Sequence, residues 1–301
     1  MKKIICLLSL LLTLAFLAGC GSGGSSNERP GSGGAAAPNE GKEDEPTATE
    51  YTVEELSVYK GESKIYGKLY VPKNSEGKFP AVVLSHSAFL TEKSLRSYAA
   101  AFASRGYLAY AFDFCGGSSS GKSDGNVKDM TIFTEVDDLK AVLSAIRLRE
   151  DANQEEIYLF GTSQGGLVSA LVAAEREEDV AGMILLYPAF NIAEQAKKYS
   201  SVVDFMGDLL PVGRAYIDTL LDYDPYEHIG DFEKEVLIIH GTADNEVAVS
   251  YSEKAAETYA HCTLEKIEGA GHGFNADNFS FGANRDEEVW RYIDEYLNLK
   301  Q

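Results

Sequence analysis

The chain has 301 residues, of which 45% are hydrophobic, so it can bury one substantial core. Its 27 lysines and arginines stand against 47 aspartates and glutamates, which gives a formal net charge of −20. This balance argues against nucleic-acid binding, which uses basic patches. It predicts an acidic surface without indicating a fold or a substrate.

The first residues have the pattern of a bacterial lipoprotein signal. A basic start is followed by an apolar run over residues 4–17, which ends at Leu17-Ala18-Gly19-Cys20. The run is shorter than the ~20 residues that a membrane-spanning helix needs. We expect residues 1–19 to be a signal peptide and Cys20 to carry a lipid, so that the protein is anchored to the extracytoplasmic face of the bacterial cell membrane. The alternative is an ordinary cleavage site that happens to contain Cys20.

Residues 20–50 are rich in Gly, Ser, Ala, Pro and Glu and contain no aromatic residue. Such a composition cannot build a packed core, so we predict a disordered linker here. The folded domain is then expected over residues 51–301. It contains Cys115 and Cys262, and we do not expect these two to pair, because they lie at the ends of different predicted strands.

Strands and helices alternate along this domain. The first two strands, 52–59 and 63–71, read as an antiparallel hairpin. Buried strands are then predicted at 79–85, 107–112, 157–160, 181–187, 235–240 and 263–267. Helices are predicted at 93–104, 130–149, 167–174, 249–259 and 286–297. The alternation predicts an α/β fold, with a mostly parallel sheet, helices on both faces and antiparallel strands at one edge.

Residues 191–230 interrupt this alternation. The segment is far longer than the usual connection of 2–6 residues, and it carries two amphipathic stretches at 202–210 and 216–221. It is either a lid over a site or a pair of surface helices. We favour a lid or cap, because long ordered connections are usually functional.

The strongest motif is Gly161-Thr162-Ser163-Gln164-Gly165-Gly166, which follows a buried strand and opens a helix. A strand that runs into a helix through G-x-S-x-G is typical of a nucleophile elbow. Small residues at Gly161 and Gly165 permit the tight turn, which lifts the Ser163 hydroxyl toward a base. An ordinary glycine-rich turn is the alternative interpretation.

A serine nucleophile needs a base and an acid that orients the base. Of the five histidines, His272 is the best candidate base, because it lies in a loop of small residues directly after the last strand. Asp244 follows a buried strand and therefore emerges at the same sheet edge as Ser163. An exposed loop histidine and a helix-capping aspartate are the alternatives. A zinc site at His240 and Asp244 is weaker, since no H-E-x-x-H is present.

Two backbone N–H groups are needed to bind an oxyanion. Gln164, directly after the nucleophile, should supply one of them. The other should come from the loop after the strand 79–85, and we choose Ala88, with Ser87 as the fallback.

The chain order Ser163, Asp244, His272 is that of the α/β-hydrolases. From about Tyr51 onward the chain resembles an α/β-hydrolase of the bacterial feruloyl (cinnamoyl) esterase type. Further matches are Phe112-Asp113-Phe114, the glycine-rich loop that ends Ser123-Asp124-Gly125, and Asp129-Met130-Thr131. The chain departs from the family pattern in having His86-Ser87-Ala88 where His-Gly-Phe is frequent, and Thr162 where a histidine is frequent.

The resemblance implies an α/β-hydrolase fold, a substrate-binding lid at 191–230, and neither a metal nor an organic cofactor. We expect a serine esterase that cleaves carboxylic esters, such as feruloyl or other acyl esters of plant or dietary origin, and whose partner is a small-molecule ester. A serine peptidase of the same fold is the first alternative. A non-catalytic binding lipoprotein is the second.

Overall fold

The computed structural model describes residues 49–73, 77–198, 212–274 and 285–298. The predicted signal peptide at 1–19, the lipidated Cys20 and nearly all of the predicted linker at 20–50 lie outside the described residues. So does the first amphipathic stretch of the insertion, 202–210. Among the described residues, no helix combines the length and the apolar character that crossing a membrane would require.

Eight strands form one sheet in the order β1-β2-β4-β3-β5-β6-β7-β8. Their bounds are β1 Tyr51–Lys60, β2 Ser63–Pro72, β3 Phe79–Ser85, β4 Leu108–Phe112, β5 Ala152–Thr162, β6 Gly182–Leu186, β7 Val236–Gly241 and β8 Cys262–Ile267. Strand β2 is antiparallel to both of its neighbours, and the pairs from β4 to β8 are parallel. The predicted hairpin at one edge and the mostly parallel sheet are confirmed.

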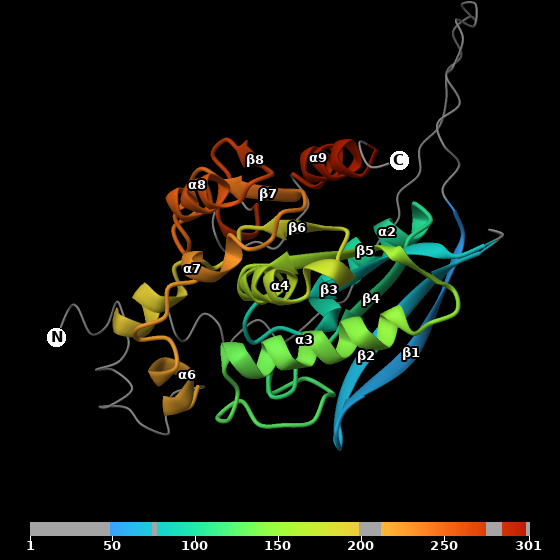
Figure 1. Cartoon of the computed structure of the whole chain (residues 1–301), viewed down its shortest axis with the longest axis horizontal. Helices are drawn as coiled ribbons and strands as arrows, with labels where there is room; N and C mark the ends of the chain where they lie inside the picture. The colour runs from blue at the N-terminus through green and yellow to red at the C-terminus, as the bar shows by residue number, and fades with distance from the viewer. Residues whose placement is uncertain (1–48, 74–76, 199–211, 275–284, 299–301) are drawn as a thin grey trace, which may run out of the picture. The chain divides into compact units, whose positions relative to one another are not determined.

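The main helices cover both faces of this sheet. They are α2 Arg96–Ser104, α3 Ile132–Arg147, α4 Gln164–Glu175, α8 Val249–Thr258 and α9 Asp286–Asn298. Figure 1 shows α3 and α4 side by side in front of the sheet. Helices α2 and α9 join the core on the opposite face, where the rings of Phe102 and Trp290 meet edge to face at 5.0 Å. The central strands are therefore buried on both sides, which explains their near-continuous apolar sequences.

Helix α3 begins at a capping box. The Thr131 hydroxyl accepts the Thr134 N–H at 3.1 Å, and the Thr134 hydroxyl accepts the Thr131 N–H at 2.9 Å. The two bonds satisfy N–H groups that the first helical turn leaves without partners. They fix the start of α3, whose first turns lie next to the candidate site.

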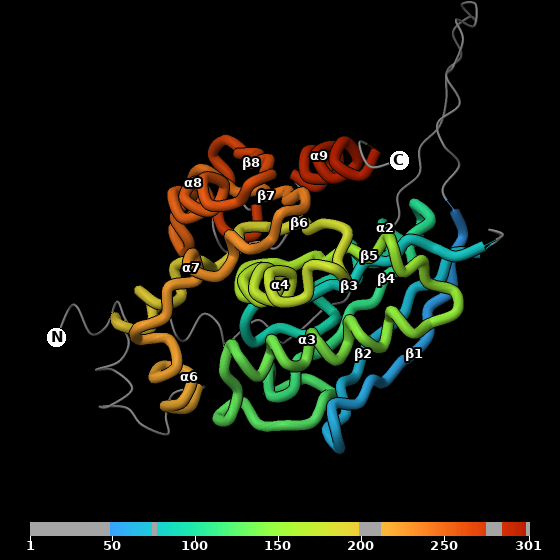
Figure 2. The backbone as a smooth tube through the Cα atoms, in the orientation of Figure 1, coloured from blue at the N-terminus to red at the C-terminus, as the bar shows by residue number. Residues whose placement is uncertain are grey.

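The described part of the insertion is helical at 192–198 and forms two short helices, α6 Arg214–Asp218 and α7 Tyr226–Ile229. Figure 2 shows α6, in orange, beside the first turn of α3, in green. The rings of Phe133 on α3 and Tyr223 in the insertion meet edge to face at 5.1 Å. The insertion is thus anchored on α3, while its role as a lid stays a prediction.

Cys115 and Cys262 are both free thiols, so the two do not form a disulfide, as expected. Burial raises the pKa of each thiol to about 12. Because the thiolate is the reactive form of cysteine, neither side chain is suited to nucleophilic chemistry at neutral pH.

Candidate functional site

Ser163 occupies the junction between β5 and α4. Its backbone has φ 50° and ψ −117°, a conformation that a residue with a side chain rarely adopts. A Cβ at Gly161 would lie 2.3 Å from the Gly165 carbonyl oxygen, and one at Gly165 would lie 2.3 Å from the Ser85 carbonyl oxygen. Only glycine fits at either position, which is the physical reason for the G-x-S-x-G spacing.

The structure brings together the three residues that the sequence proposed as nucleophile, base and acid. His272 Nδ1 lies 2.7 Å from Asp244 Oδ2, and His272 Nε2 lies 3.1 Å from Ser163 Oγ. A carboxylate only accepts hydrogen bonds, so Nδ1 carries the proton in this pairing. Nε2 is then the acceptor for the serine hydroxyl. The three residues follow β5, β7 and β8, so their side chains lie where the carboxyl ends of these parallel strands meet.

Asp244 is held as a carboxylate by its surroundings. Burial by itself would raise its pKa, but hydrogen bonds from His240 and His272 and from the Val247 N–H hold the pKa well below its usual range. Oδ1 accepts the N–H groups of Glu246 and Val247, each at 2.9 Å. The aspartate therefore also caps the turn that follows β7, while Oδ2 faces His272.

The buried His240 side chain supports the turn that contains Asp244. Its Nδ1 lies 2.7 Å from the Ser252 hydroxyl, and its Nε2 lies 2.8 Å from the Val247 carbonyl and 3.2 Å from Asp244 Oδ2. Both ring nitrogens thus have protein partners. Over the described ranges, no group of three or more His, Cys, Asp or Glu side chains is arranged to hold a metal ion.

Tyr187, directly after β6, supports the imidazole and was not singled out from the sequence. Its ring meets the His272 ring edge to face at 4.7 Å and the Phe274 ring at 5.0 Å. Its backbone has φ 39°, another positive value at a non-glycine residue. The sequence offers no signal for this contact beyond the position of Tyr187 at a strand end.

The loop after β3 is fixed by His86. The ring donates from Nδ1 to the Ser87 carbonyl at 2.8 Å, and Nε2 accepts the Phe114 N–H at 3.2 Å. Burial lowers the pKa of His86, and the neutral ring is the form that can accept a hydrogen bond at Nε2. His86 is therefore a structural residue that holds the segment in which Ala88 lies.

The two departures from the family pattern contact each other. The Ser87 hydroxyl lies 2.9 Å from the Thr162 hydroxyl and 3.3 Å from the Thr162 carbonyl oxygen. The pair links the loop that carries Ala88 to the residue before Ser163.

Gln164 is the first residue of α4, where backbone N–H groups have no partner within the helix. The oxyanion roles of Gln164 and Ala88 stay predictions.

Asp113 explains one of the motifs quoted for the resemblance. Its Oδ1 accepts the Glu92 N–H and its Oδ2 accepts the Lys122 N–H, both at 2.7 Å. One buried carboxylate thus joins the segment after the β3 loop to the glycine-rich loop at 115–125. This role of Asp113 in holding two loops together was not predicted from the sequence.

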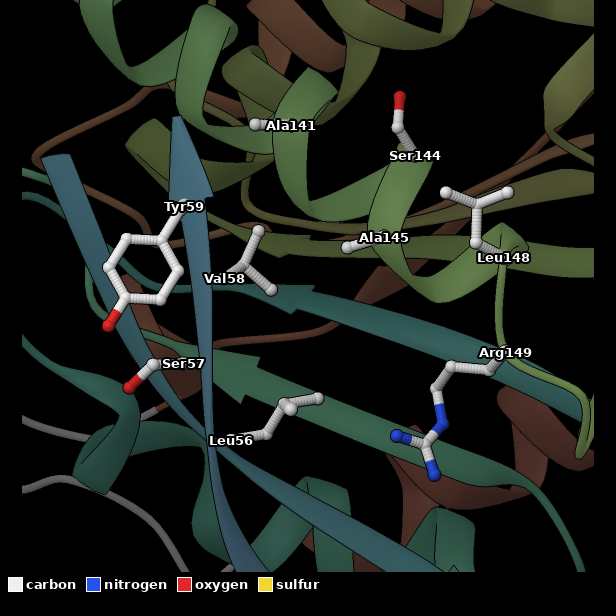
Figure 3. A pocket seen from close by; sticks show the side chains of 9 residues that line it. All are labelled: Leu56, Ser57, Val58, Tyr59, Ala141, Ser144, Ala145, Leu148 and Arg149. Atoms are coloured by element: carbon white, nitrogen blue, oxygen red, sulfur yellow. The ribbon is translucent and has the colours of Figure 1, made fainter. Parts of the chain in front are cut away.

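A separate hollow of about 460 Å³ lies between β1 and α3. Figure 3 shows the nine residues that line it, which are Leu56, Ser57, Val58, Tyr59, Ala141, Ser144, Ala145, Leu148 and Arg149. They include none of the residues around Ser163. This hollow is therefore not the candidate site.

Comparison with known proteins gives a fold and a match to a family model over part of the chain. Residues 78–221 match the family model described as "Serine aminopeptidase, S33", a segment that includes Ser163 and ends before Asp244 and His272. The uncharacterised protein PA2218 of Pseudomonas aeruginosa is 34% identical over 111 residues, which are 36% of this chain and 29% of the relative. The chain thus matches less than a third of the length of that curated relative.

Solved structures are similar to this protein over most of the chain. Est1E from Butyrivibrio proteoclasticus with ferulic acid bound has a TM-score of 0.68 and 23% identity, covering 81% of this chain and 98% of that one. The α/β hydrolase GrgF from Penicillium sp. sh18 has a TM-score of 0.64 and 14% identity, covering 83% and 96%. At these identities the likeness shows a shared fold.

Proposed function

Because this chain has the α/β-hydrolase fold, we propose that it is a serine hydrolase that cleaves carboxylic esters. The observation that carries the proposal is the position of His272, hydrogen-bonded to Asp244 on one side and to Ser163 on the other. Such an arrangement lets an imidazole take a proton from a hydroxyl that would otherwise be a weak nucleophile.

In the proposed reaction, Ser163 Oγ attacks the ester carbonyl as His272 Nε2 takes its proton. Asp244 fixes the imidazole by its Nδ1–H and stabilises the positive charge that forms on the ring. The N–H groups of Gln164 and Ala88 bind the oxyanion. His272 then protonates the leaving alcohol. In the second half of the reaction, His272 takes a proton from water, the resulting hydroxide attacks the acyl-enzyme, and His272 returns the proton to Ser163 Oγ as the acid is released.

For the acyl group we propose hydroxycinnamates such as ferulate. The support is the similar structure that holds ferulic acid. A serine peptidase is the second candidate, and it is favoured by the family model, whose description is a serine aminopeptidase. A non-catalytic binding protein is disfavoured, because a ligand-binding role gives no reason for a serine to be hydrogen-bonded to a histidine–aspartate pair.

Hydrolysis rates on a substrate panel test this proposal. We expect turnover of p-nitrophenyl acyl esters and methyl ferulate that exceeds turnover of aminoacyl p-nitroanilides by at least tenfold. Ser163→Ala should remove it, since loss of a serine nucleophile costs about 10⁶-fold in a related mechanism. Faster cleavage of the amides would favour the peptidase. No turnover of any substrate, or full turnover by Ser163→Ala, would contradict the proposal.

We also propose that the protein is exported and lipid-anchored through Cys20, on the basis of the signal-like first 20 residues. In bacteria, the full chain should incorporate labelled palmitate, and Cys20→Ser should abolish incorporation. Equal labelling of both forms would refute anchoring at this residue.

A further inference from the structure

The side chain of Gln164 is buried and held at both ends. Its exposed fraction is 2%. Its Nε2 donates to Glu135 Oε2 at 2.7 Å, and its Oε1 accepts the Tyr216 hydroxyl at 2.6 Å. The three residues come from α3, from α4 and from α6 in the insertion, so one amide group joins three separate segments beside Ser163.

We infer that Glu135 and Tyr216 are positioning residues that hold Gln164, and hence its backbone N–H, in place for the oxyanion. The inference rests on the proposed function. An oxyanion donor works because its direction is set before the reaction. With both ends of the amide bonded, the side chain of Gln164 has a single orientation, and the first residue of α4 cannot rotate without breaking a buried hydrogen bond.

The elbow needs such support, because its backbone is strained. Ser163 keeps a positive φ that its side chain disfavours, so the surrounding contacts must impose this conformation. Gln164 is the residue that follows the strained position. A buried anchor on its side chain opposes relaxation of the Ser163–Gln164 segment.

The environment of Glu135 fits a positioning role better than a packing role. The side chain is fully buried on α3, and among the described residues its Oε1 has no hydrogen-bond partner. Burial raises the pKa of Glu135 to about 8, so that the neutral acid predominates at pH 7. An apolar residue would fill this space without the cost of burying a polar group. The hydrogen bond to Gln164 gives a reason for a carboxyl group here.

Tyr216 brings the insertion into this arrangement. The start of α6 is packed closely against the segment before α3, since a Cβ at Gly213 would overlap the Lys128 carbonyl oxygen. This contact fixes α6, and α6 presents the Tyr216 hydroxyl to Gln164. The insertion therefore contributes to the reaction by orienting an oxyanion donor, which goes beyond covering a substrate.

The test is a double-mutant cycle in the full-length protein with Tyr216→Phe, Gln164→Ala and the double variant, assayed on the best ester. Tyr216→Phe removes one hydroxyl and keeps the ring. Tyr226→Phe is the matched control, because it removes a hydroxyl that donates to the Tyr251 carbonyl elsewhere in the same region. Hydrogen–deuterium exchange of the peptide 163–167 and the rate of Ser163 labelling by a fluorophosphonate are measured beside turnover.

We expect Tyr216→Phe to lower kcat about 5- to 20-fold with KM changed less than twofold, as for an interaction made in the transition state. In the Gln164→Ala background the same change should have no further effect. Tyr216→Phe should also speed exchange in the peptide 163–167 and slow labelling, while Tyr226→Phe changes none of these. Additive effects, or a kcat unchanged by Tyr216→Phe, would overturn the inference. A wild-type protein that is not labelled at Ser163 would instead refute the proposed function on which the inference rests.

Discussion

Asp244→Asn should fold normally and lose about 10³- to 10⁴-fold in kcat on the best ester. In the wild type, Asp244 Oδ2 accepts the Nδ1–H of His272 at 2.7 Å and so leaves Nε2 free to accept the serine proton. An asparagine can offer an N–H at this position, which stabilises the opposite tautomer of the imidazole. The base then faces Ser163 with a proton already on Nε2.

Asparagine keeps the oxygen that caps Glu246 and Val247, so the melting temperature should change little beside the loss of activity. Asp137→Asn, an acid-to-amide change at an exposed position of α3, is the control and should leave both quantities unchanged. Initial rates and thermal unfolding of the three proteins give the comparison. A kcat within tenfold of the wild type would rule out Asp244 as the partner of the base.

The second large effect concerns stability and pH. Burial raises the pKa of Glu135 to about 8, from an ordinary value of 4.5 for a glutamate. Below pH 4.5 the carboxyl is protonated in both folded and unfolded chains. As pH rises toward 8, the unfolded chain releases this proton while the folded chain retains it, so folding stability falls through this interval.

Glu135→Gln removes this titration. Relative to the wild type, the free energy of unfolding of the variant should therefore rise between pH 5 and pH 9, by a few kcal/mol in order of magnitude. Urea unfolding at unit steps of pH measures the difference between the two proteins, and Asp137→Asn is again the control. A difference that stays constant over this interval would show that the Glu135 carboxyl does not titrate as proposed.

Most strands and helices of the fold could be predicted from local patterns in the sequence. Strand β3 has the predicted bounds, because its apolar run is continuous and ends at a loop. Strand β5 begins five residues earlier than predicted, because Asn153 to Glu156 are polar and the pairing of Ala152 with Phe79 of β3 is not visible in the local sequence. Helix α4 begins at Gln164 rather than at 167, because the glycines that the elbow requires obscure its first turn.

The proximity of Ser163, Asp244 and His272 could also be predicted, because each follows a parallel strand and the carboxyl ends of parallel strands share one edge. The supporting residues could not. Glu135 looks like one more polar position on an amphipathic helix, and only the packing of α3 against α4 and α6 gives it Gln164 as a partner. For His240 the sequence offered only a weak zinc interpretation, and its hydrogen bonds to Ser252 and Val247 show that it supports the turn that contains Asp244.

The central claim is that Ser163 is a nucleophile activated by His272. Its most direct test is a fluorophosphonate reaction on the full-length protein, followed by mass spectrometry of the intact chain and of its peptides. We predict one adduct per chain, located on Ser163, absent from Ser163→Ala and formed at least a hundredfold more slowly in His272→Ala. A folded wild-type protein that forms no adduct, or forms it on another residue, would contradict the account.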